Sequence, residues 1–354
     1  MGVETIVWAG TPTAPPTQRV CDELILKPFD DAEALAYFCE RADVATVEFE
    51  NIPAEALEGV DHAIGLHPSP HAIQTAQQRG KEKRFLRENN IPCAPFAFVD
   101  SLDDLENAYH ELGPDAVLKT AAFGYDGKGQ VRLSAGADLA AAWQEVGEQP
   151  CVLEGFIDFA CEVSVLLARG KNGESAAFPV AENQHRHHML DLTIVPARID
   201  KSIRDQAKKI AQDLAEALDY RGLLAVEFFI TKSGEVLVNE LAPRPHNSGH
   251  YTMNGCVTSQ FEQQMRAVLG WPLGSVDRVA PTVMLNLLGD MWHGEPRALD
   301  RDLIVGMPSA KLHLYGKTDP GERRKMGHAN FVGENALTRA QEVKDRLLNP
   351  GQSY

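Results

Sequence analysis

Two glutamates lie inside apolar, strand-like segments. Glu227 and Glu240 interrupt the runs LLAVEFFIT and EVLVNELA, which a short polar turn separates. A two-residue Ser-Gly turn predicts a hairpin in which Lys232 faces Glu235. The same register places Glu227 opposite Glu240, with Cβ atoms about 5 Å apart, so two ionised carboxylates would repel each other. A divalent cation removes that repulsion, and Mg²⁺ prefers one or two carboxylates together with phosphate oxygens.

The residues around the pair bear on its interpretation. Taken alone, it is more simply explained as a structural pair, with one carboxylate protonated or paired with Arg244. However, the second run is followed by a polar segment, APRPHNSGH, which contains Arg244, His246, Asn247 and Ser248. Functional side chains often lie where strands end and loops begin. Asn239 adds another oxygen beside Glu240, so the pattern favours a Mg²⁺ (or Mn²⁺) site with Glu227 and Glu240 as ligands.

A glycine-rich loop follows the predicted strand AVLK, which ends at Lys119. The loop FGYDGKGQ contains Gly124, Gly127 and Gly129. Glycines let backbone N–H groups close over phosphate oxygens, and the lysine adds positive charge. The spacing matches neither the Walker pattern nor the dinucleotide fingerprint, so by itself the loop is more often a plain turn.

Two further segments could hold a nucleotide. The run VLEGFI offers Glu154 and a backbone that could hydrogen-bond a flat base. Glu162 interrupts the apolar strand FACEVSV and could accept a ribose hydroxyl. Taken alone, Glu162 is more simply explained as part of the exposed face of an alternating strand.

Composition excludes several classes of protein. The chain has 354 residues and a net charge of -16, from 50 acidic and 34 basic side chains. That charge argues against a general nucleic-acid or anionic-membrane binder, but not against phosphate ligands at a local basic cluster. Six scattered cysteines without a Cys-x-x-Cys pair, no apolar run of bilayer length and no signal peptide predict a cytoplasmic location.

Alternating strand and helix patterns predict an α/β protein of three lobes, the middle one small. In the first lobe, which is predicted to end near Pro70, VETIVWAG and VATVEFE are predicted strands. One helix is predicted to follow it, from about 72 to 89. The second lobe contains the glycine-rich loop and a helix that begins at Ser101 and ends at Gly113. The third contains the carboxylate hairpin, a long helix over 202–220 and further strands.

Together these motifs resemble the ATP-grasp enzymes. The likeness is carried by Lys119 with GYDGKGQ, by VLEGFIDFACEVSV, by AVEFFI and VLVNELAPRPHNSGHYT, by RKMGH, and by VEFENIP and PSP. The specific resemblance, over nearly the whole chain, is to the 5-(carboxyamino)imidazole ribonucleotide synthases. It implies an α/β (α+β) ATP-grasp fold: an N-terminal partial Rossmann-like lobe over 1–78, a small central lid lobe over 79–167, and a catalytic lobe with its C-terminal extension over 168–354.

The resemblance also implies a reaction. ATP would phosphorylate bicarbonate to carboxyphosphate, and the exocyclic amine of 5-aminoimidazole ribonucleotide would capture the carboxyl group. The products would be the carbamate, ADP and phosphate, in purine (IMP) synthesis. The family further implies a homodimer. Positioning and charge neutralisation dominate phosphoryl transfer of this kind, in agreement with the residue types above.

Each candidate residue receives a role from the resemblance. The metal ligands would be Glu227 and Glu240. The expected ATP contacts are Arg79, Lys119, Gly124, Asp126, Gly127, Gly129, Gln130, Glu154, Gly155, Phe156, Ile157, Glu162, His185, Asn239 and Glu240. The expected catalytic residues are Tyr125, Arg244 and His246. The expected ribonucleotide contacts are Tyr125, Asn247, Ser248, Lys317 and Arg324, the last two as clamps on its phosphate.

Two features depart from the family pattern. The family opens with a strand and a GGGQLG-type loop ahead of the segment that here begins GVETIVWAG. Their absence predicts an exposed edge in the N-terminal sheet and a reduced ribonucleotide pocket, through either a misplaced start codon or a truncation. In addition, DPGERRK replaces the usual Arg-Pro-Gly-Arg-Lys, which displaces or removes one cation of the phosphate clamp.

Two other functions remain open from the sequence. The same fold with another acceptor would be a biotin-type carboxylase or a formate-dependent glycinamide ribonucleotide transformylase, although PRPHNSGH favours the first interpretation. Loss of the N-terminal segment could instead leave a nucleotide-binding protein without activity. ADP release that depends on the acceptor separates the three hypotheses.

Overall fold

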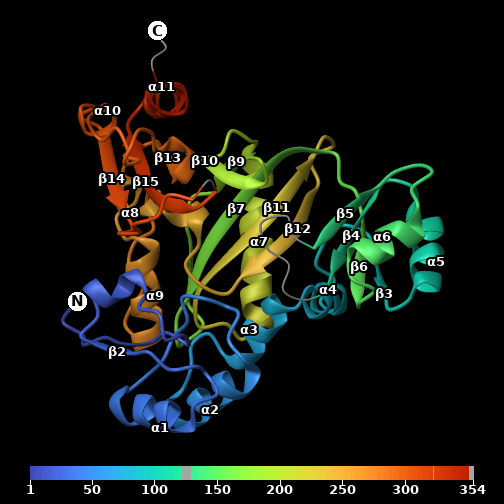
Figure 1. The fold of residues 1–354 in the computed structure, drawn as a ribbon, viewed down its shortest axis with the longest axis horizontal. Helices are drawn as coiled ribbons and strands as arrows, with labels where there is room; N and C mark the ends of the chain where they lie inside the picture. The colour runs from blue at the N-terminus through green and yellow to red at the C-terminus, as the bar shows by residue number, and fades with distance from the viewer. Residues whose placement is uncertain (122–128, 322, 351–354) are drawn as a thin grey trace.

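The computed structural model describes residues 1–121, 129–321 and 323–350. Figure 1 shows the N-terminal lobe below a large central sheet, the lobe of β3–β6 to its right and the C-terminal strands and helix α11 above. Among the described residues, no helix is both long and apolar enough to cross a membrane.

The N-terminal lobe joins a two-stranded parallel sheet to three helices. Its elements are β1 (Ile6–Trp8), η1 (Pro16–Arg19), β2 (Glu23–Ile25), α1 (Ala32–Arg41), α2 (Ala54–Ile64) and α3 (Pro70–Gln77). The strand predicted for VATVEFE is wrong. In the described chain only Ala45 pairs there, through one bridge to Leu66. A strand needs a neighbour along its whole length, and one bridge does not supply it. Val47 still packs into the lobe core with Leu57.

The single helix predicted over 72–89 is also wrong. It is two helices, α3 and α4 (Arg79–Glu88), separated at Gln78, whose backbone is extended (φ -117°, ψ 105°). The physical reason lies in packing: α3 lies against β12 of the large sheet, whereas α4 shares that core through Leu86 and also lies against β6 of the small lobe. The break therefore starts a new helix at Arg79 and directs it towards the small lobe.

The small lobe is an antiparallel sheet of order β3-β6-β4-β5 with two helices. Its elements are β3 (Phe96–Val99), α5 (Leu102–Leu112), β4 (Ala116–Thr120), β5 (Gln130–Leu133), α6 (Leu139–Glu145) and β6 (Cys151–Gly155). The predicted helix ends are confirmed. Ser101 Oγ accepts the N–H of Asp104 at 3.1 Å, and Gly113 follows the helix with a φ of 91°.

The large sheet has nine strands in the described residues, in the order β12-β11-β7-β9-β10-β13-β15-β14, with β8 paired to β7. Its strands are β7 (Phe159–Arg169), β8 (Ser175–Ala177), β9 (Ala181–Arg186), β10 (Met189–Val195), β11 (Gly222–Thr231), β12 (Val236–Ala242), β13 (Thr282–Leu288), β14 (Ala310–Leu314) and β15 (Lys325–Val332). Its helices are α7 (Lys201–Ala217), η2 (Asn247–Gly249), α8 (Thr252–Gly255), α9 (Gln260–Leu269), η3 (Gly289–Met291), α10 (Asp302–Val305) and α11 (Ala336–Leu348).

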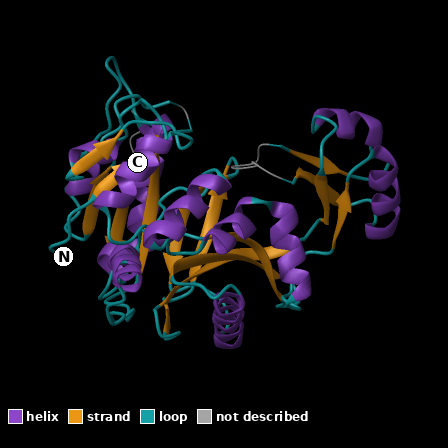
Figure 2. Cartoon of the chain, turned by 90° about the horizontal axis from the view of Figure 1, so that it is seen from below, coloured by secondary structure: helices purple, strands orange, loops and turns teal. Residues whose placement is uncertain are grey.

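Helices cover both faces of this sheet (Figure 2). Val165 and Val226 pack with α7 in one core, whereas the alternate residues Leu166 and Ala225 form a separate core with Tyr251. This alternation is the period of two expected for a strand buried on both sides. The lobe boundary expected at 168 falls inside β7, and the division into domains stays a prediction.

The hairpin β11–β12 places Glu227 opposite Glu240, as predicted, but by another route. Ile230 pairs with Val236, so the turn has three residues instead of two. A bulge at Asn239 then inserts one residue into β12 and restores the expected register. The longer turn and the bulge shift the pairing register in opposite directions, so the two shifts cancel at Glu227 and Glu240.

The expected ion pair of the turn is wrong. Lys232 lies within the longer turn and contacts Asp158 at 2.5 Å, not Glu235. Glu235 instead accepts hydrogen bonds from the hydroxyls of Ser233 and Thr231. Lys232 and Asp158 are both exposed, so their pair contributes little to stability.

Candidate active site

Glu227 and Glu240 form a carboxylate pair on one face of the large sheet. The side chain of Glu227 is only 14% exposed. Burial, followed by the charge of Glu240, raises the pKa of Glu227 to about 8. A cation would remove this repulsion, and carboxylate oxygens are the hard ligands that Mg²⁺ prefers. The described residues contain no group of three or more His, Cys, Asp or Glu side chains arranged for a metal, so the pair would need phosphate oxygens to complete a coordination shell.

His246 connects the pair to the polar segment that follows β12. Its Nδ1 accepts the N–H of Ser248 at 3.4 Å, so the ring proton lies on Nε2, 3.6 Å from a carboxylate oxygen of Glu227. The hydroxyl of Ser164 on β7 donates to Ser248 Oγ at 2.9 Å, which fixes Ser248 in turn. Burial, and then the charge of Arg244, lower the pKa of His246 well below its ordinary value, so the imidazole is neutral.

Arg244 is bound to the N-terminal lobe and not to the carboxylate pair. Its Nη2 donates to Glu50 Oε1 at 2.9 Å and its Nε donates to Glu50 Oε2, a bidentate arrangement. Burial alone would raise the pKa of Glu50, but the hydrogen bonds and charge of Arg244 outweigh it and lower that pKa. The structural alternative, in which Arg244 neutralises Glu227 or Glu240, is therefore not supported. Sequence reasoning missed Glu50, although it lies in the motif VEFENIP.

Three cations surround Glu154 at the end of the small lobe. Its Oε2 lies 3.1 Å from Lys119 Nζ and 3.2 Å from Lys83 Nζ. Arg79 Nε lies 3.8 Å from the other oxygen. Burial would raise the pKa of Glu154, but the charges of Lys83, Lys119 and Arg79 outweigh it and lower that pKa. Three positive charges on one carboxylate leave a net positive site, which suits a polyphosphate.

Lys83 and Glu82 are the functional candidates that the sequence did not reveal. Lys83 is 1% exposed and lies one helical turn from Arg79, so the four-residue spacing on α4 was the available signal. Glu82 accepts the backbone N–H of Leu241 at 3.0 Å and so holds β12 beside Glu240. Burial raises the pKa of Glu82 to about 7. Helix α4 therefore contacts both the cations and the carboxylate strand.

The predicted base-binding run has few free donors. The N–H of Gly155 donates to Pro95 O and the N–H of Phe156 donates to Asp115 O, each at 2.8 Å. Ile157 is the next residue of the run. The side chain of Glu154 points towards Lys83, Lys119 and Arg79. The ring of Phe156 stacks under the guanidinium of Arg132 at 3.4 Å from the centroid.

The predicted ribose and nucleotide contacts meet on neighbouring strands. His185 Nδ1 lies 2.7 Å from Glu162 Oε2, and the carboxylate outweighs burial to raise the pKa of His185. At the other lobe, Gln130 pairs with Lys119 across β4 and β5. A Cβ at Gly129 (φ +68°) would lie 2.7 Å from the hydroxyl of Thr120, so only glycine fits. The remaining candidates of the loop, Gly124, Tyr125, Asp126 and Gly127, lie outside the described residues.

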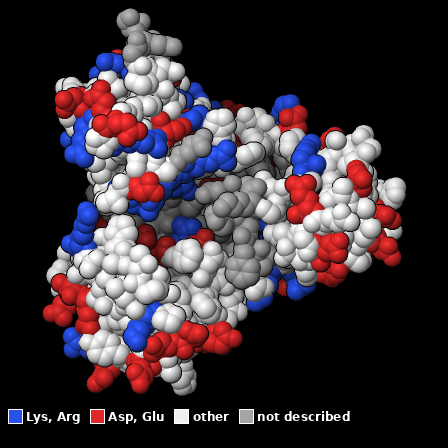
Figure 3. Space-filling view, in the orientation of Figure 1, with Lys and Arg blue, Asp and Glu red and all other residues white. Residues whose placement is uncertain are grey.

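The predicted ribonucleotide contacts divide into two groups. Ser248 is fully buried and holds His246, whereas the amide nitrogen of Asn247 is buried without a hydrogen-bond partner in the described structure. Lys317 and Arg324 lie between β14 and β15, where Lys317 Nζ donates to the carbonyl of Lys325 at 2.7 Å. Basic side chains gather along the edge of the C-terminal lobe that faces the central hollow (Figure 3).

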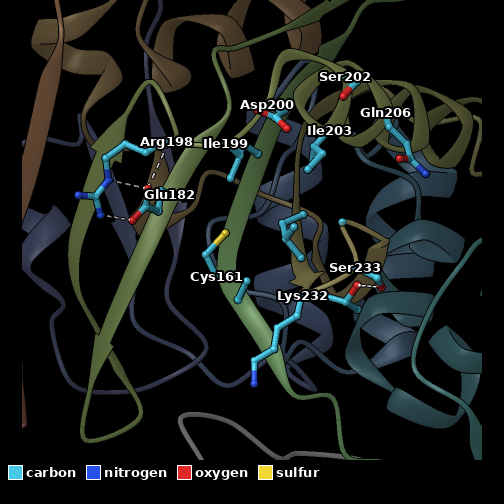
Figure 4. Close-up of a pocket in the computed structure, with 14 residues that line it drawn as sticks. Cys161, Glu182, Arg198, Ile199, Asp200, Ser202, Ile203, Gln206, Lys232 and Ser233 are labelled. Atoms are coloured by element: carbon cyan, nitrogen blue, oxygen red, sulfur yellow. Dashed lines mark hydrogen bonds and ion pairs between the residues drawn. The ribbon is translucent and has the colours of Figure 1, made fainter.

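A groove of about 910 Å³ lies on the opposite face of the large sheet (Figure 4). Cys161 lines it, whereas the next residue, Glu162, faces the same side as Glu227 by strand register. Arg198 and Glu182 form a bidentate ion pair at its wall, with Arg198 Nε donating at 2.9 Å. Because the groove lies behind the carboxylate pair, it is separate from the candidate active site.

Three family models match the chain. The ATP-grasp domain matches residues 84–261, the phosphoribosylaminoimidazole carboxylase C-terminal domain matches residues 282–342, and the ribonucleotide synthetase preATP-grasp domain matches residues 1–77. Among curated proteins, N5-carboxyaminoimidazole ribonucleotide synthase of Bacillus subtilis (strain 168) is 43% identical over 337 residues, covering 94% of this chain and 87% of that protein.

Solved structures agree over nearly the full length. An N5-carboxyaminoimidazole ribonucleotide synthetase in complex with ADP has a TM-score of 0.89 at 38% identity, covering 97% of this chain and 89% of that one. The N5-carboxyaminoimidazole synthase of Aspergillus clavatus in complex with ADP and 5-aminoimidazole ribonucleotide has a TM-score of 0.86 at 26% identity, covering 98% of this chain and 92% of that one. The predicted ATP-grasp fold is thereby confirmed.

Proposed function

This chain belongs to the N5-carboxyaminoimidazole ribonucleotide synthases, ATP-grasp ligases of purine biosynthesis, and from that membership we propose how it works. It uses ATP to carboxylate the amine of 5-aminoimidazole ribonucleotide with bicarbonate. One observation carries the mechanism: His246 lies 3.6 Å from Glu227, which joins the carboxylate pair to the segment that follows β12. A phosphate site and an acceptor site are thus adjacent.

Two displacements complete the reaction. A bicarbonate oxygen attacks the γ-phosphorus of ATP, the bond to the β,γ-bridging oxygen breaks, and ADP leaves carboxyphosphate behind. The amine nitrogen then attacks the carboxyl carbon, the carbon–oxygen bond to phosphate breaks, and the departing phosphate takes the proton that the amine loses as the carbamate forms. Both steps depend on positioning and charge neutralisation.

The cations around Glu154 and the carboxylate pair hold the nucleotide from two sides. Lys119 and Arg79 contact the phosphates, while Glu154 and the buried Lys83 set their positions. Glu227 and Glu240 would hold Mg²⁺, which supplies neutralisation of the β- and γ-phosphate charge when bound. The side-chain oxygen of Asn239 lies on the same strand. Glu162 and His185 contact the ribose side of the nucleotide.

The acceptor side is formed by the segment after β12. Arg244, oriented by Glu50, binds the bicarbonate-derived carboxylate, and the neutral His246 lies beside it. Asn247 and Tyr125 contact the ribonucleotide, and Lys317 and Arg324 bind its phosphate. We also propose that the protein forms a homodimer, is cytosolic and uses bicarbonate.

Acceptor-dependent ADP release tests the function directly. We expect ADP to form only when bicarbonate and 5-aminoimidazole ribonucleotide are both present, with one carbamate per ADP. Equal ADP release without the ribonucleotide, and no carbamate, would contradict coupled synthesis. Release with formate and glycinamide ribonucleotide would identify the alternative acceptor, and ATP binding without turnover would identify an inactive binding protein.

Replacing Glu50 with Gln should weaken the use of bicarbonate without changing the KM for ATP. Loss of one charge-assisted hydrogen-bond pair leaves the half-buried Arg244 free to move, and we expect kcat/KM for bicarbonate to fall about tenfold to a hundredfold. The KM for ATP should stay within about twofold, because the Glu154 cluster is unchanged. Glu58→Gln on α2 serves as the control, since Glu58 contacts only Gln74 among the described residues. Equal effects of both variants would contradict a specific role for Glu50.

A further inference from the structure

A loop after β14 collects positive charge where the C-terminal and N-terminal lobes meet. Lys317 and Arg324 both bind backbone carbonyls in this region: Lys317 Nζ donates to Lys325 O at 2.7 Å, and Arg324 Nη1 donates to Asp319 O at 3.0 Å. Burial, and then the charges of Arg324 and Lys325, lower the pKa of Lys317. The two side chains are therefore oriented by the loop itself and close enough to repel each other.

Arg19 of the N-terminal lobe reaches this loop. A Cβ placed on Gly316, the residue before Lys317, would lie 3.0 Å from Arg19 Nη1. Gly316 has a φ of +73°, a backbone conformation that favours glycine, and the absence of a side chain leaves room for the guanidinium. The contact joins residues nearly three hundred positions apart in the sequence, and it adds a third cation to the loop.

Nothing in the described structure neutralises Arg19. Its side chain is exposed, and its guanidinium makes no hydrogen bond or ion pair with the described residues. Arg19 ends the short helix η1, whose first residue, Pro16, follows Pro15. Two fixed φ angles limit the backbone freedom of the segment that carries Arg19. Arg324 has one carboxylate neighbour, Asp319 at 3.6 Å, but the Arg19 guanidinium has none in the described structure. A guanidinium without a counter-ion beside Gly316, one residue before Lys317, is arranged for an anion.

We propose that Arg19 binds the 5′-phosphate of the ribonucleotide together with Lys317 and Arg324. This inference rests on the proposed function and adds a residue to it. A phosphate monoester carries close to two negative charges, and a planar guanidinium binds two of its oxygens at once. The N-terminal lobe thereby supplies a third cation to the phosphate clamp, in addition to Lys317 and Arg324 of the C-terminal loop.

Steady-state kinetics of Arg19→Gln test the proposal. We expect the KM for 5-aminoimidazole ribonucleotide to rise about tenfold, with kcat and the KM for ATP within about twofold of the parent enzyme. Arg19→Lys keeps the charge without the bidentate geometry and should recover part of the loss. Arg41→Gln is the matched control, because Arg41 is an arginine of the same lobe that pairs with Glu23. An unchanged KM in Arg19→Gln, or an equal rise in Arg41→Gln, would overturn the proposal.

The nucleoside without its phosphate separates a phosphate contact from a structural effect. With aminoimidazole riboside as acceptor, the parent enzyme and Arg19→Gln should react equally slowly, since the group that Arg19 contacts is missing. A continued difference between them would mean that Arg19 acts on the sugar or on the lobe, and would refute the phosphate contact.

Direct binding keeps this test independent of the proposed function. If the parent enzyme releases no ADP with the ribonucleotide, the proposed function fails, and calorimetry with ribose 5-phosphate still examines Arg19. We expect the dissociation constant to be about tenfold weaker in Arg19→Gln than in the parent protein. Equal binding to the two proteins, or no binding to either, would overturn the inference on its own.

Discussion

Glu240→Gln is expected to lower turnover by about a thousandfold or more while the protein remains folded. Glu240 lies opposite Glu227 across the hairpin, and a neutral amide in its place would leave a single charged ligand for the proposed magnesium, which would neutralise the ATP phosphates. A loss of about 4 kcal/mol of transition-state stabilisation corresponds to that factor. Folding should not suffer, because the substitution also removes the repulsion that raises the pKa of Glu227.

Metal-dependent melting distinguishes this explanation from a general loss of structure. Mg²⁺ with ADP should raise the melting temperature of the parent protein but not of Glu240→Gln. Glu235→Gln is the control, since Glu235 lies at the same hairpin turn and its side chain contacts only turn hydroxyls among the described residues. The metal assignment fails if Glu240→Gln turns over normally at ordinary Mg²⁺, or if Glu235→Gln loses activity to the same extent.

Lys83→Met and Lys119→Met should produce opposite patterns although both remove a positive charge from Glu154. The side chain of Lys83 is 1% exposed and enclosed, whereas that of Lys119 is 15% exposed. Lys83→Met leaves a buried carboxylate short of a partner, and we expect the free energy of unfolding to fall by about 3 kcal/mol. Lys119→Met should instead reduce kcat/KM for ATP about a hundredfold, with less than about 1 kcal/mol lost in stability.

Urea denaturation and ATP kinetics on the same two variants measure this difference. Each variant serves as the control for the other, because the charge removed and the partner carboxylate are identical. If Lys119→Met unfolds as easily as Lys83→Met, Lys119 has a structural role as well. If Lys83→Met retains full stability, Arg79 and Lys119 neutralise Glu154 sufficiently, and the positioning role of Lys83 is refuted.

The N-terminal lobe takes part in the site through several contacts that span the sequence. Glu50 holds Arg244, Arg19 reaches Gly316, and Glu82 at the start of the next lobe holds the backbone of Leu241. Each joins a segment from the first hundred residues to one beyond position 240. One proposed binding residue, Arg244, is therefore positioned by a side chain of a different lobe. We expect Glu50→Gln to affect bicarbonate and Arg19→Gln to affect the ribonucleotide, and neither to affect ATP.

Much of the candidate site was predictable because its residues lie in local patterns. The alternation of the two apolar runs predicts the hairpin, and the Ser101 and Gly113 signals predict a helix, since both depend on neighbours within a few positions. The opposition of Glu227 and Glu240 was predicted correctly only because a longer turn and a bulge at Asn239 cancel. A bulge is decided by how the strand packs, which the alternation does not record.

Tertiary packing decided the rest. The break at Gln78 lets α4 contact β6 of the small lobe as well as the large-sheet core, although the helical pattern runs through it. The strand predicted around Val47 fails for want of a neighbour, and Lys83 becomes a partner of Glu154 only when α4 lies against β6. By itself the sequence determined the family, the fold and the types of side chain in the site, because these depend on composition and short spacings. The tertiary structure alone decided which distant charges meet, because the free energy of a buried ion pair depends on a distance that no local pattern contains.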